Sequence, residues 1–208
     1  MILAFGYWLS FSDVIGERLR SNIYAGGVFS WVYNGSWSSA SGIAVWNGST
    51  WSALGGGVDG HVHAIESNGT DVYACGVFTT AGGSAAANVA VWNGSTWSAM
   101  GAGLNATCNT LRTFGGHLYA GGLFMQAGGS TANRVALWDG TSWSPLMNGA
   151  SNGVNSYVYT ISGTTNLVVA GYFTTAGSIP ARRVAIWTPL SIGPETIPDP
   201  GPDPVPVH

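Results

Sequence analysis

The stretch AVWNGSTW at residues 44–51 returns unchanged at residues 90–97 and in a close variant, ALWDGTSW, at residues 136–143. Each copy starts 46 residues after the previous one, and a truncated copy, Ala185-Ile186-Trp187, follows 49 residues later. A second landmark keeps step with the first: AGGVF at 25–29, ACGVF at 74–78, AGGLF at 120–124 and AGYF at 170–173. Four copies of two landmarks at near-constant spacing indicate a chain built from four structural repeats.

Each repeat has the pattern of four short strands. In the second copy, residues 62–67 form a partly apolar run that ends at an Asn-Gly pair, and a strand pattern follows at residues 71–79. A glycine-rich break leads to residues 89–92 and 96–100, which are separated by the turn signal Asn93-Gly94. No segment has the i, i+3, i+4 apolar spacing of a helix. The chain is therefore predicted to be all-β.

Alternation along the second strand of that copy predicts which side chains share a face. Val72 and Ala74 belong to one face of the sheet, and Tyr73 and Cys75 to the other. One such sheet cannot bury both of its faces alone, so neighbouring sheets are expected to stack around an axis.

Four antiparallel strands per repeat, at a period near 46 residues, are typical of a propeller blade. We therefore predict a four-bladed β-propeller with four-stranded antiparallel blades. The last repeat lacks its own fourth strand, and residues 6–10 (GYWLS) loosely resemble residues 50–54 (TWSAL), which fill that place in the first repeat. The N-terminal strand is thus predicted to complete the last blade and close the ring. A five-bladed propeller is the alternative, although residues 1–20 are too few for a hidden fifth unit.

The composition changes near residue 192. Residues 1–191 hold the four repeats of 46–49 residues and are assigned to the propeller. Residues 192–208 are rich in proline, which favours an extended polyproline conformation. We interpret this segment as a proline-rich linker or tail. As a linker it would lead to another module of a larger multidomain chain.

The repeat resembles a known class of propeller. The run FTTAGG at 78–83, followed by NVAVWNGSTWSAMG at 88–101, is similar to the kelch-like repeats of secreted bacterial and fungal cell-surface proteins. The resemblance covers roughly residues 7–190 and implies a propeller of the broad galactose-oxidase-like class. It does not imply oxidase chemistry.

The charge pattern excludes some classes of protein. Charged residues make up only 7% of the chain, lysine is absent, and the formal net charge is −3, which would repel nucleic-acid phosphates. No run of eighteen apolar residues occurs, so membrane insertion is not expected. The apolar N-terminus lacks the basic region and cleavage site of a signal peptide. As a compositional hint, the scarcity of charge favours an extracellular, cell-surface or virion location.

The sequence holds no recognisable catalytic motif. Six acidic residues lie outside the tail, and no pair of them recurs at a shared repeat position. No nucleophile elbow, phosphate loop or metal-binding cysteine cluster occurs. His61 and His63 are two residues apart on a predicted strand, but they lack a third ligand for a metal ion. We therefore expect no enzyme activity, metal or cofactor. A glycoside hydrolase with an axial site is retained as an alternative.

Repeated tryptophans at the end of the third strand are the candidate ligand-binding residues. Two interpretations are open. In the first, the indoles pack between blades; in the second, they form a ring of sites in which each indole stacks on a sugar. In the second interpretation the residue after each tryptophan supplies a polar partner, although an Asn-Gly turn alone also explains it. The set consists of Trp46, Trp92, Trp138 and Trp187 with Asn47, Asn93 and Asp139.

Other residues are less fully explained by the repeat. Trp31, Tyr33 and Trp37 lie in an insertion of the first repeat, and would form a contact surface if exposed. Arg134 and Arg183 precede the third strand at matching positions, where they could cap a blade edge or contact an acidic ligand.

The two cysteines lie in adjacent repeats. Cys75 belongs to the second strand of one repeat, and Cys108 begins the first strand of the next. The sequence leaves two possibilities open: the cysteines form a disulfide between blades, or they are two separate buried side chains.

These observations favour a non-catalytic recognition module of a surface or extracellular protein. We expect it to bind carbohydrate through repeated aromatic sites. Its expected partners are a glycan or a surface protein, with no nucleic acid. A structural or protein–protein interaction module of a cell-surface or virion assembly is the alternative.

Overall fold

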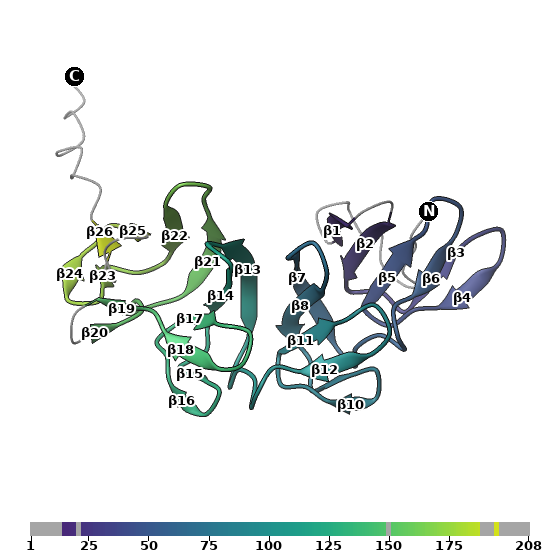
Figure 1. Cartoon of the computed structure of the whole chain (residues 1–208), viewed down its shortest axis with the longest axis horizontal. Helices are drawn as coiled ribbons and strands as arrows, with labels where there is room; N and C mark the ends of the chain where they lie inside the picture. The colour runs from purple at the N-terminus through teal and green to yellow at the C-terminus, as the bar shows by residue number, and fades with distance from the viewer. Residues whose placement is uncertain (1–13, 20–21, 149–150, 188–193, 196–208) are drawn as a thin grey trace, which may run out of the picture.

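The computed structural model describes residues 14–19, 22–148, 151–187 and 194–195, and all of their regular structure is β. Four antiparallel sheets of four strands follow one another along the chain (Figure 1). The first contains β1 (Val14–Leu19), β2 (Asn22–Gly27), β5 (Ile43–Trp46) and β6 (Trp51–Ala53). The second contains β7 (His61–Ser67), β8 (Val72–Val77), β11 (Val89–Trp92) and β12 (Trp97–Ala99). The third contains β13 (Cys108–Phe114), β14 (His117–Gly122), β17 (Val135–Trp138) and β18 (Trp143–Pro145). The fourth contains β21 (Val158–Ser162), β22 (Leu167–Gly171), β25 (Val184–Trp187) and β26 (Pro194–Glu195).

Short two-stranded hairpins accompany the four sheets. In each repeat one hairpin joins the second strand to the third, and a further hairpin lies between the third and fourth sheets. Their strands are β3 (Trp31–Tyr33) with β4 (Trp37–Ser39), β9 (Thr80–Ala81) with β10 (Ser84–Ala85), β15 (Gln126–Ala127) with β16 (Ser130–Thr131), β23 (Thr175–Ala176) with β24 (Ile179–Pro180), and β19 (Met147–Asn148) with β20 (Ser151–Asn152).

The turn between the third and fourth strands has a local cause. Gly48 adopts a φ of 100°, a conformation that glycine adopts without a steric penalty. The side-chain Oδ1 of Asn47 accepts the backbone N–H groups of Ser49 and Thr50, both at 2.9 Å. The same pattern recurs at Asn93 and at Asp139. The repeated Asn/Asp-Gly pair therefore fixes the register of Trp46 opposite Trp51 and of its equivalents.

Consecutive sheets pack face to face in an arc. The inner strands β1, β7, β13 and β21 contact one another in that order. Val72 and Ala74 are buried against the first sheet, whereas Tyr73 and Cys75 are buried against the third. The predicted alternation of faces is therefore confirmed. Burial of both faces explains why the inner sheets have apolar residues on either side.

Fourth-strand tryptophans lock neighbouring sheets together. The indole Nε1 of Trp97 donates to the carbonyl oxygen of Leu54, directly after β6 of the first sheet, at 2.8 Å. Trp143 donates in the same way to Met100, directly after β12 of the second sheet, also at 2.8 Å. Both indoles are 7% exposed, so each bond is shielded from water and contributes about 1 kcal/mol to stability.

A disulfide joins the second and third sheets. Cys75 of β8 and Cys108 of β13 are bonded, with their Cα atoms 5.5 Å apart. This settles the choice that the sequence left open between a bridge and two separate buried thiols.

Polar groups also connect the inner strands. The Glu66 carboxylate accepts the backbone N–H of Thr113 at 3.0 Å and lies 3.9 Å from the guanidinium of Arg112. Arg112 in turn donates to the carbonyl oxygen of Gly163 at 2.9 Å, so one chain of contacts spans the second, third and fourth sheets.

The fourth strand of the last sheet differs from the prediction. β26, which pairs with β25, occupies the edge that we assigned to the N-terminal strand. Residues 6–10, on which that assignment rested, lie outside the described residues. β26 also lies within the segment that we interpreted as a linker. An edge strand tolerates proline because one side of it makes no ladder hydrogen bonds, which explains how Pro194 is accommodated.

The four sheets form an open arc in the described part of the chain. Figure 1 shows the first and fourth sheets at opposite ends of the molecule, with the second and third between them. The predicted four-stranded antiparallel sheets are present, whereas a closed four-bladed ring is not seen. The described residues contain no helix suited to crossing a bilayer.

Candidate ligand-binding sites

The third-strand tryptophans are stacked in pairs with those of the fourth strand. The ring centroids are 5.7 Å apart for Trp46 and Trp51, and the two following repeats have similar values of 5.6 and 5.3 Å. Trp46, Trp92 and Trp138 are half-buried, and each retains some surface. The Trp92 ring also fills the space beside Gly55 of the preceding sheet, where a Cβ atom would collide with it. Packing between sheets is thus an observed role of these rings.

Trp187 differs from the other three. It is only 3% exposed, and no fourth-strand tryptophan among the described residues stacks on it. Its indole N–H has no hydrogen-bond partner in the part of the chain that the structure describes. A ring buried to this extent offers no face to a ligand, so the four predicted sites are not equivalent.

The polar residues after these tryptophans are engaged in their own turns. Asp139 accepts the N–H groups of Ser142 and Thr141 at 2.8 Å each. These hydrogen bonds lower the pKa of Asp139 below its ordinary value, so its carboxylate stays ionised. Asn47 and Asn93 use their Oδ1 atoms in the same way.

A cavity of about 540 Å³ lies between the second and third sheets. Two predicted site residues, Trp138 and Asp139, line it. Its other walls come from residues that we did not single out from the sequence. The aromatic ones are Tyr73 and Phe114, and the polar ones include Asn68, Asp71, Thr113 and His117.

Hydrogen bonds hold the polar wall of this cavity in place. The Asn68 Nδ2 donates to the Tyr73 hydroxyl at 2.8 Å, and its Oδ1 accepts the N–H of Asp71 at 2.8 Å. Burial, and then the negative charge of Asp71, raise the pKa of Tyr73, so its phenol stays neutral. The cavity therefore combines fixed aromatic surfaces with ionised and neutral hydrogen-bonding groups.

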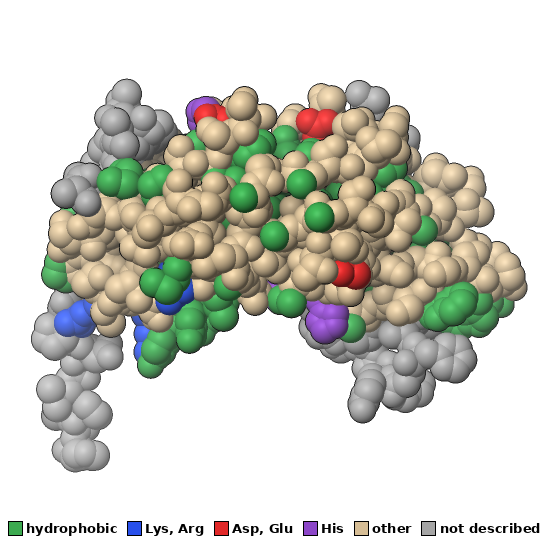
Figure 2. Space-filling model, turned by 90° about the horizontal axis from the view of Figure 1, so that it is seen from below, with side chains coloured by type: hydrophobic (Ala, Val, Ile, Leu, Met, Phe, Trp, Pro, Cys, Tyr) green, Lys and Arg blue, Asp and Glu red, His purple; other side chains and the backbone are tan. Residues whose placement is uncertain are grey.

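The predicted aromatic insertion forms the β3–β4 hairpin. Trp31, Tyr33 and Trp37 are 41%, 37% and 41% exposed, and the rings of Tyr33 and Trp37 are 5.1 Å apart. Val32, between the first two, is fully buried. Asn34 holds the hairpin against β6 through bonds to both the N–H and the carbonyl oxygen of Trp51, at 2.8 and 2.6 Å. Figure 2 shows a green patch at the right-hand end of the molecule, where β3 and β4 lie in Figure 1. The three aromatic side chains are thus exposed, as a contact surface requires.

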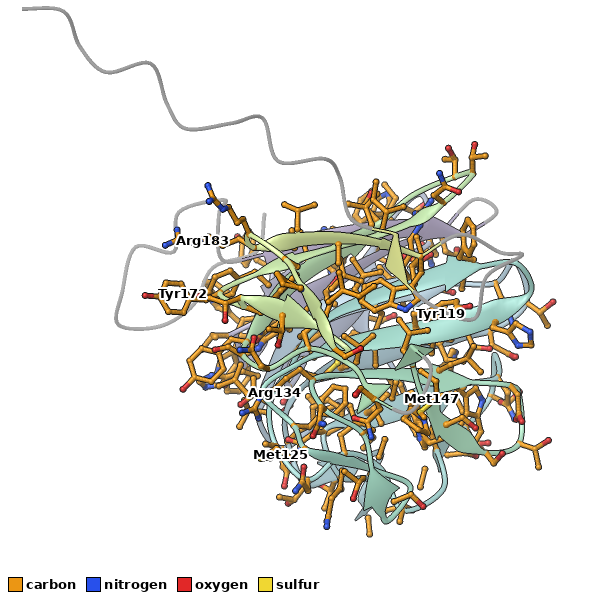
Figure 3. All side chains as sticks on the ribbon, turned by 90° about the vertical axis from the view of Figure 1, so that its left-hand side faces the viewer. Tyr119, Met125, Arg134, Met147, Tyr172 and Arg183 are labelled. Carbon is orange, nitrogen blue, oxygen red and sulfur yellow. A yellow bond between two sulfur atoms is a disulfide. The ribbon has the colours of Figure 1, made fainter. Side chains whose placement is uncertain are left out.

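A second exposed surface combines arginine and tyrosine at the opposite end. The Arg134 guanidinium lies over the Tyr157 ring at 5.6 Å, and that of Arg183 lies over the Tyr172 ring at 4.9 Å. Figure 3 shows Arg183 and Tyr172 side by side at the edge of the molecule, and in Figure 2 the blue side chains lie toward the left-hand end. Neither Arg134 nor Arg183 has a carboxylate partner among the described residues.

Both arginines adopt an unusual backbone conformation. Their φ angles are 67° and 68°, in the left-handed region that non-glycine residues seldom adopt. Gly42 occupies the matching place in the first sheet and Asn88 in the second, with φ of 69° and 64°. The same hydrogen bond accompanies this conformation in all four sheets: the N–H of each residue donates to the carbonyl oxygen of the phenylalanine of its own repeat, at 2.8–3.0 Å. A cavity of about 420 Å³ adjoins Arg134.

The histidine pair forms no cluster. A bulge between Val62 and Ala64 makes His63 the extra residue of β7, so regular alternation does not place it on the same face as His61. Among the described residues, no three His, Cys, Asp or Glu side chains gather as metal ligands would.

The residues missed from the sequence share one property. Tyr73 comes from the second sheet, and Phe114 and His117 come from the ends of β13 and β14 in the third. All three are distant from Trp138 in the sequence, so no local motif records their approach. The Arg–Tyr pairs left a weak signal, since Arg134 and Arg183 replace the glycine and asparagine of the earlier repeats.

No protein-family model matches the chain, and no curated protein matches it in sequence. Solved structures do match. The computationally designed Ika8 protein has a TM-score of 0.51 and 14% identity over 83% of this chain and 44% of its own. The β-propeller domain of the Trilobed protease from Pyrococcus furiosus, described as having an open velcro topology, has a TM-score of 0.50 and 14% identity over 84% of this chain and 51% of its own. The chain thus spans about half the length of either protein. At this identity the likeness concerns the fold alone, and together with the four antiparallel sheets it supports a β-propeller fold for this chain.

Proposed function

We propose that the chain is a non-catalytic recognition module, built from kelch-like propeller repeats, that binds carbohydrate in the cavity between its second and third sheets. The observation that supports this most directly is the lining of that cavity. Three aromatic rings line it, those of Trp138, Tyr73 and Phe114. The same lining contains polar groups: the Asp71 and Asp139 carboxylates, the Asn68 amide and the His117 imidazole.

Sugars match this lining in two respects. Their C–H faces are apolar and stack on aromatic rings, while their hydroxyls donate to carboxylate oxygens and accept from amide and imidazole N–H groups. The polar groups at Asn68 and Asp139 are already fixed by turn hydrogen bonds. Such a site loses little conformational entropy when a ligand binds.

Binding fits this cavity better than glycoside hydrolysis. A retaining or inverting hydrolase needs one carboxyl group with a raised pKa, which donates a proton to the leaving oxygen. Hydrogen bonds from Ser142 and Thr141 instead lower the pKa of Asp139. A carboxyl group held in its ionised form is a poor general acid.

A glycan array followed by calorimetry on the best ligand tests this proposal. Trp138→Ala is expected to weaken binding at least about tenfold, since it removes the largest stacking surface. Asp139→Asn provides a second variant that preserves folding, because asparagine fills the same turn at positions 47 and 93. It should also weaken binding if the carboxylate accepts sugar hydroxyls.

Tyr159→Ala is the matched control, because this aromatic residue is 58% exposed on β21 and does not line the cavity. It should leave the affinity unchanged. Absence of any glycan ligand, or equal binding by Trp138→Ala and the native chain, would contradict the proposal.

A protein-interaction role is the second candidate. Arg134 and Arg183, which have no carboxylate partner among the described residues, form a surface with the exposed Tyr157, Tyr172 and Met125. Arginine, tyrosine and methionine are enriched at protein interfaces. An acidic partner would suit its charge. The Cys75–Cys108 disulfide supports the proposal of an extracellular or cell-surface location for either function.

A further inference from the structure

Each sheet of the arc has two faces, which we name by their neighbours. The forward face packs on the sheet that follows in the chain, and the backward face packs on the sheet that precedes it. Ile43, Val89 and Val135 belong to forward faces, and Val72, Leu118 and Leu167 to backward faces. Among the described residues, no four-stranded sheet covers the backward face of the first sheet or the forward face of the fourth. The β3–β4 hairpin packs on part of the former, where Val32 lies against Ala44, and leaves Ile23 exposed.

The backward face of the first sheet retains the residues of an interface. Ile23 occupies the position of Val72, Leu118 and Leu167, which are 1%, 3% and 1% exposed, yet Ile23 is 41% exposed. Trp51 occupies the position of Trp97 and Trp143, whose indoles donate to the preceding sheet. Trp51 is half-exposed, and its indole makes no such bond in the described part of the chain.

The forward face of the fourth sheet is the counterpart. Val184 occupies the position of Ile43, Val89 and Val135, all of which are 0% exposed, but it is itself partly exposed. Ala170, which stands where the second sheet has the buried Cys75, is also partly exposed. Figure 3 looks onto this end of the molecule, with the fourth sheet nearest the viewer.

We propose that two copies of this chain associate head to tail, with the forward face of the fourth sheet of each copy packed on the backward face of the first sheet of the other. The two faces are complementary because the interface between successive sheets within the chain already consists of the same repeat positions. Two such contacts related by a two-fold axis close an eight-sheet ring and leave no face open.

Two further observations favour a second copy as the occupant. The two solved structures compared above are about twice as long, since this chain matches 44% and 51% of them. An assembly of two copies would match that length. Charge opposes the association little, because only 7% of the residues are charged.

The native disulfide provides a template for the test. Cys75 and Cys108 join the second strand of one sheet to the first strand of the next. By register, Ala170 corresponds to Cys75 and Val14, which pairs with Gly27 as Cys108 pairs with Gly122, corresponds to Cys108. A Val14→Cys/Ala170→Cys variant is therefore expected to form a disulfide between copies.

The measurement is mass under non-reducing denaturing conditions, together with sedimentation of the native chain. We expect a covalent species of twice the 21.4 kDa chain mass from the double variant, and a dimer of the native chain. Neither single-cysteine variant should give this head-to-tail product. Ile23→Asp changes a residue that is already exposed in one copy, so the chain should fold, and dimerisation should weaken at least about tenfold.

Other outcomes overturn the proposal. A native chain that sediments as a monomer, with no cross-linked species, rules the dimer out and assigns the end faces to other partners. A disulfide formed within one chain instead shows that a single copy closes on itself. Glycan binding is a separate readout, because the cavity between the second and third sheets lies within one copy and should be retained in Ile23→Asp.

Discussion

At the scale of single residues, the repeat provides its own controls. Trp97 and Trp51 occupy the same position in two sheets, but only Trp97 donates its indole N–H to a described carbonyl group, that of Leu54. We expect Trp97→Phe to lower the free energy of unfolding by about 1–3 kcal/mol, because the buried carbonyl of Leu54 loses its partner. Urea unfolding of Trp97→Phe and of the control variant Trp51→Phe measures the difference. Trp51→Phe should cost clearly less, and equal losses would show that the hydrogen bond has no part in the effect.

Asp59 supports a prediction on pH dependence. Burial opposes its ionisation, but hydrogen bonds from the Thr79 hydroxyl and from the N–H groups of Thr80 and Thr79 outweigh burial and lower the pKa from 3.8 to about 2. A carboxyl group with a lower pKa in the folded state stabilises the fold above pH 3.8. This contribution is lost as the pH falls toward 2. We expect the free energy of unfolding to decrease over that interval, by an amount kept small by the exposure of Asp59.

Asp59→Asn is the matched variant for this titration. Asn105 and Asn155 fill the same place in the next two repeats and accept the corresponding N–H groups at 2.9–3.0 Å. The variant should therefore fold normally and lose part of the decrease between pH 4 and 2, as followed by urea unfolding at several pH values. An identical pH profile in the native chain and the variant would exclude Asp59 as the cause.

At the scale of strands and sheets, the disulfide joins two elements that also pack through an apolar core. Cys75 and Cys108 are 33 residues apart, so their bond restricts a long loop of the unfolded chain. The double variant Cys75→Ala/Cys108→Ala is expected to lose about 3–4 kcal/mol of stability in the chain-entropy model. Thermal unfolding of the native protein and of this variant provides the comparison. An unchanged midpoint would mean that the packing of β8 on β13 alone sets the stability of this contact.

The strands that could be predicted from the sequence are those with local causes. Asn47-Gly48 and its copies fix the third and fourth strands, because the side chain and the glycine together determine the turn. The pairing of β26 with β25 has no such cause. It rests on two residues in a proline-rich segment, and only the free edge of β25 selects them. The cavity at Trp138 likewise depends on the approach of two sheets, which the sequence of either repeat does not encode separately.

The tryptophans also show which features have a local cause and which depend on neighbouring sheets. Their positions could be predicted, since they belong to the repeat. Their burial could not, because Trp46 and Trp187 each end a strand of the form Ala-Val/Ile-Trp but are buried to different extents. Repetition in the sequence therefore predicts the blade, whereas the ends of the array determine which copies remain accessible.

At the scale of the whole molecule, stability should vary along the arc. In a stack of repeats each sheet is stabilised by its neighbours, so a sheet with two neighbours is more stable than one with a single neighbour. The second and third sheets have two neighbours each and also share the disulfide and the Glu66–Thr113 contact. We expect native-state hydrogen exchange to be slowest in β8, β11, β14 and β17, and faster in β2, β5, β22 and β25. If two copies associate through their end sheets, exchange in β2 and β22 should slow as the protein concentration rises. Exchange rates at low and high concentration therefore provide an internal comparison. Exchange that is uniform along the four sheets at low concentration would contradict this view, since it would mean that the array unfolds as one unit and that its end sheets are no less protected than its centre.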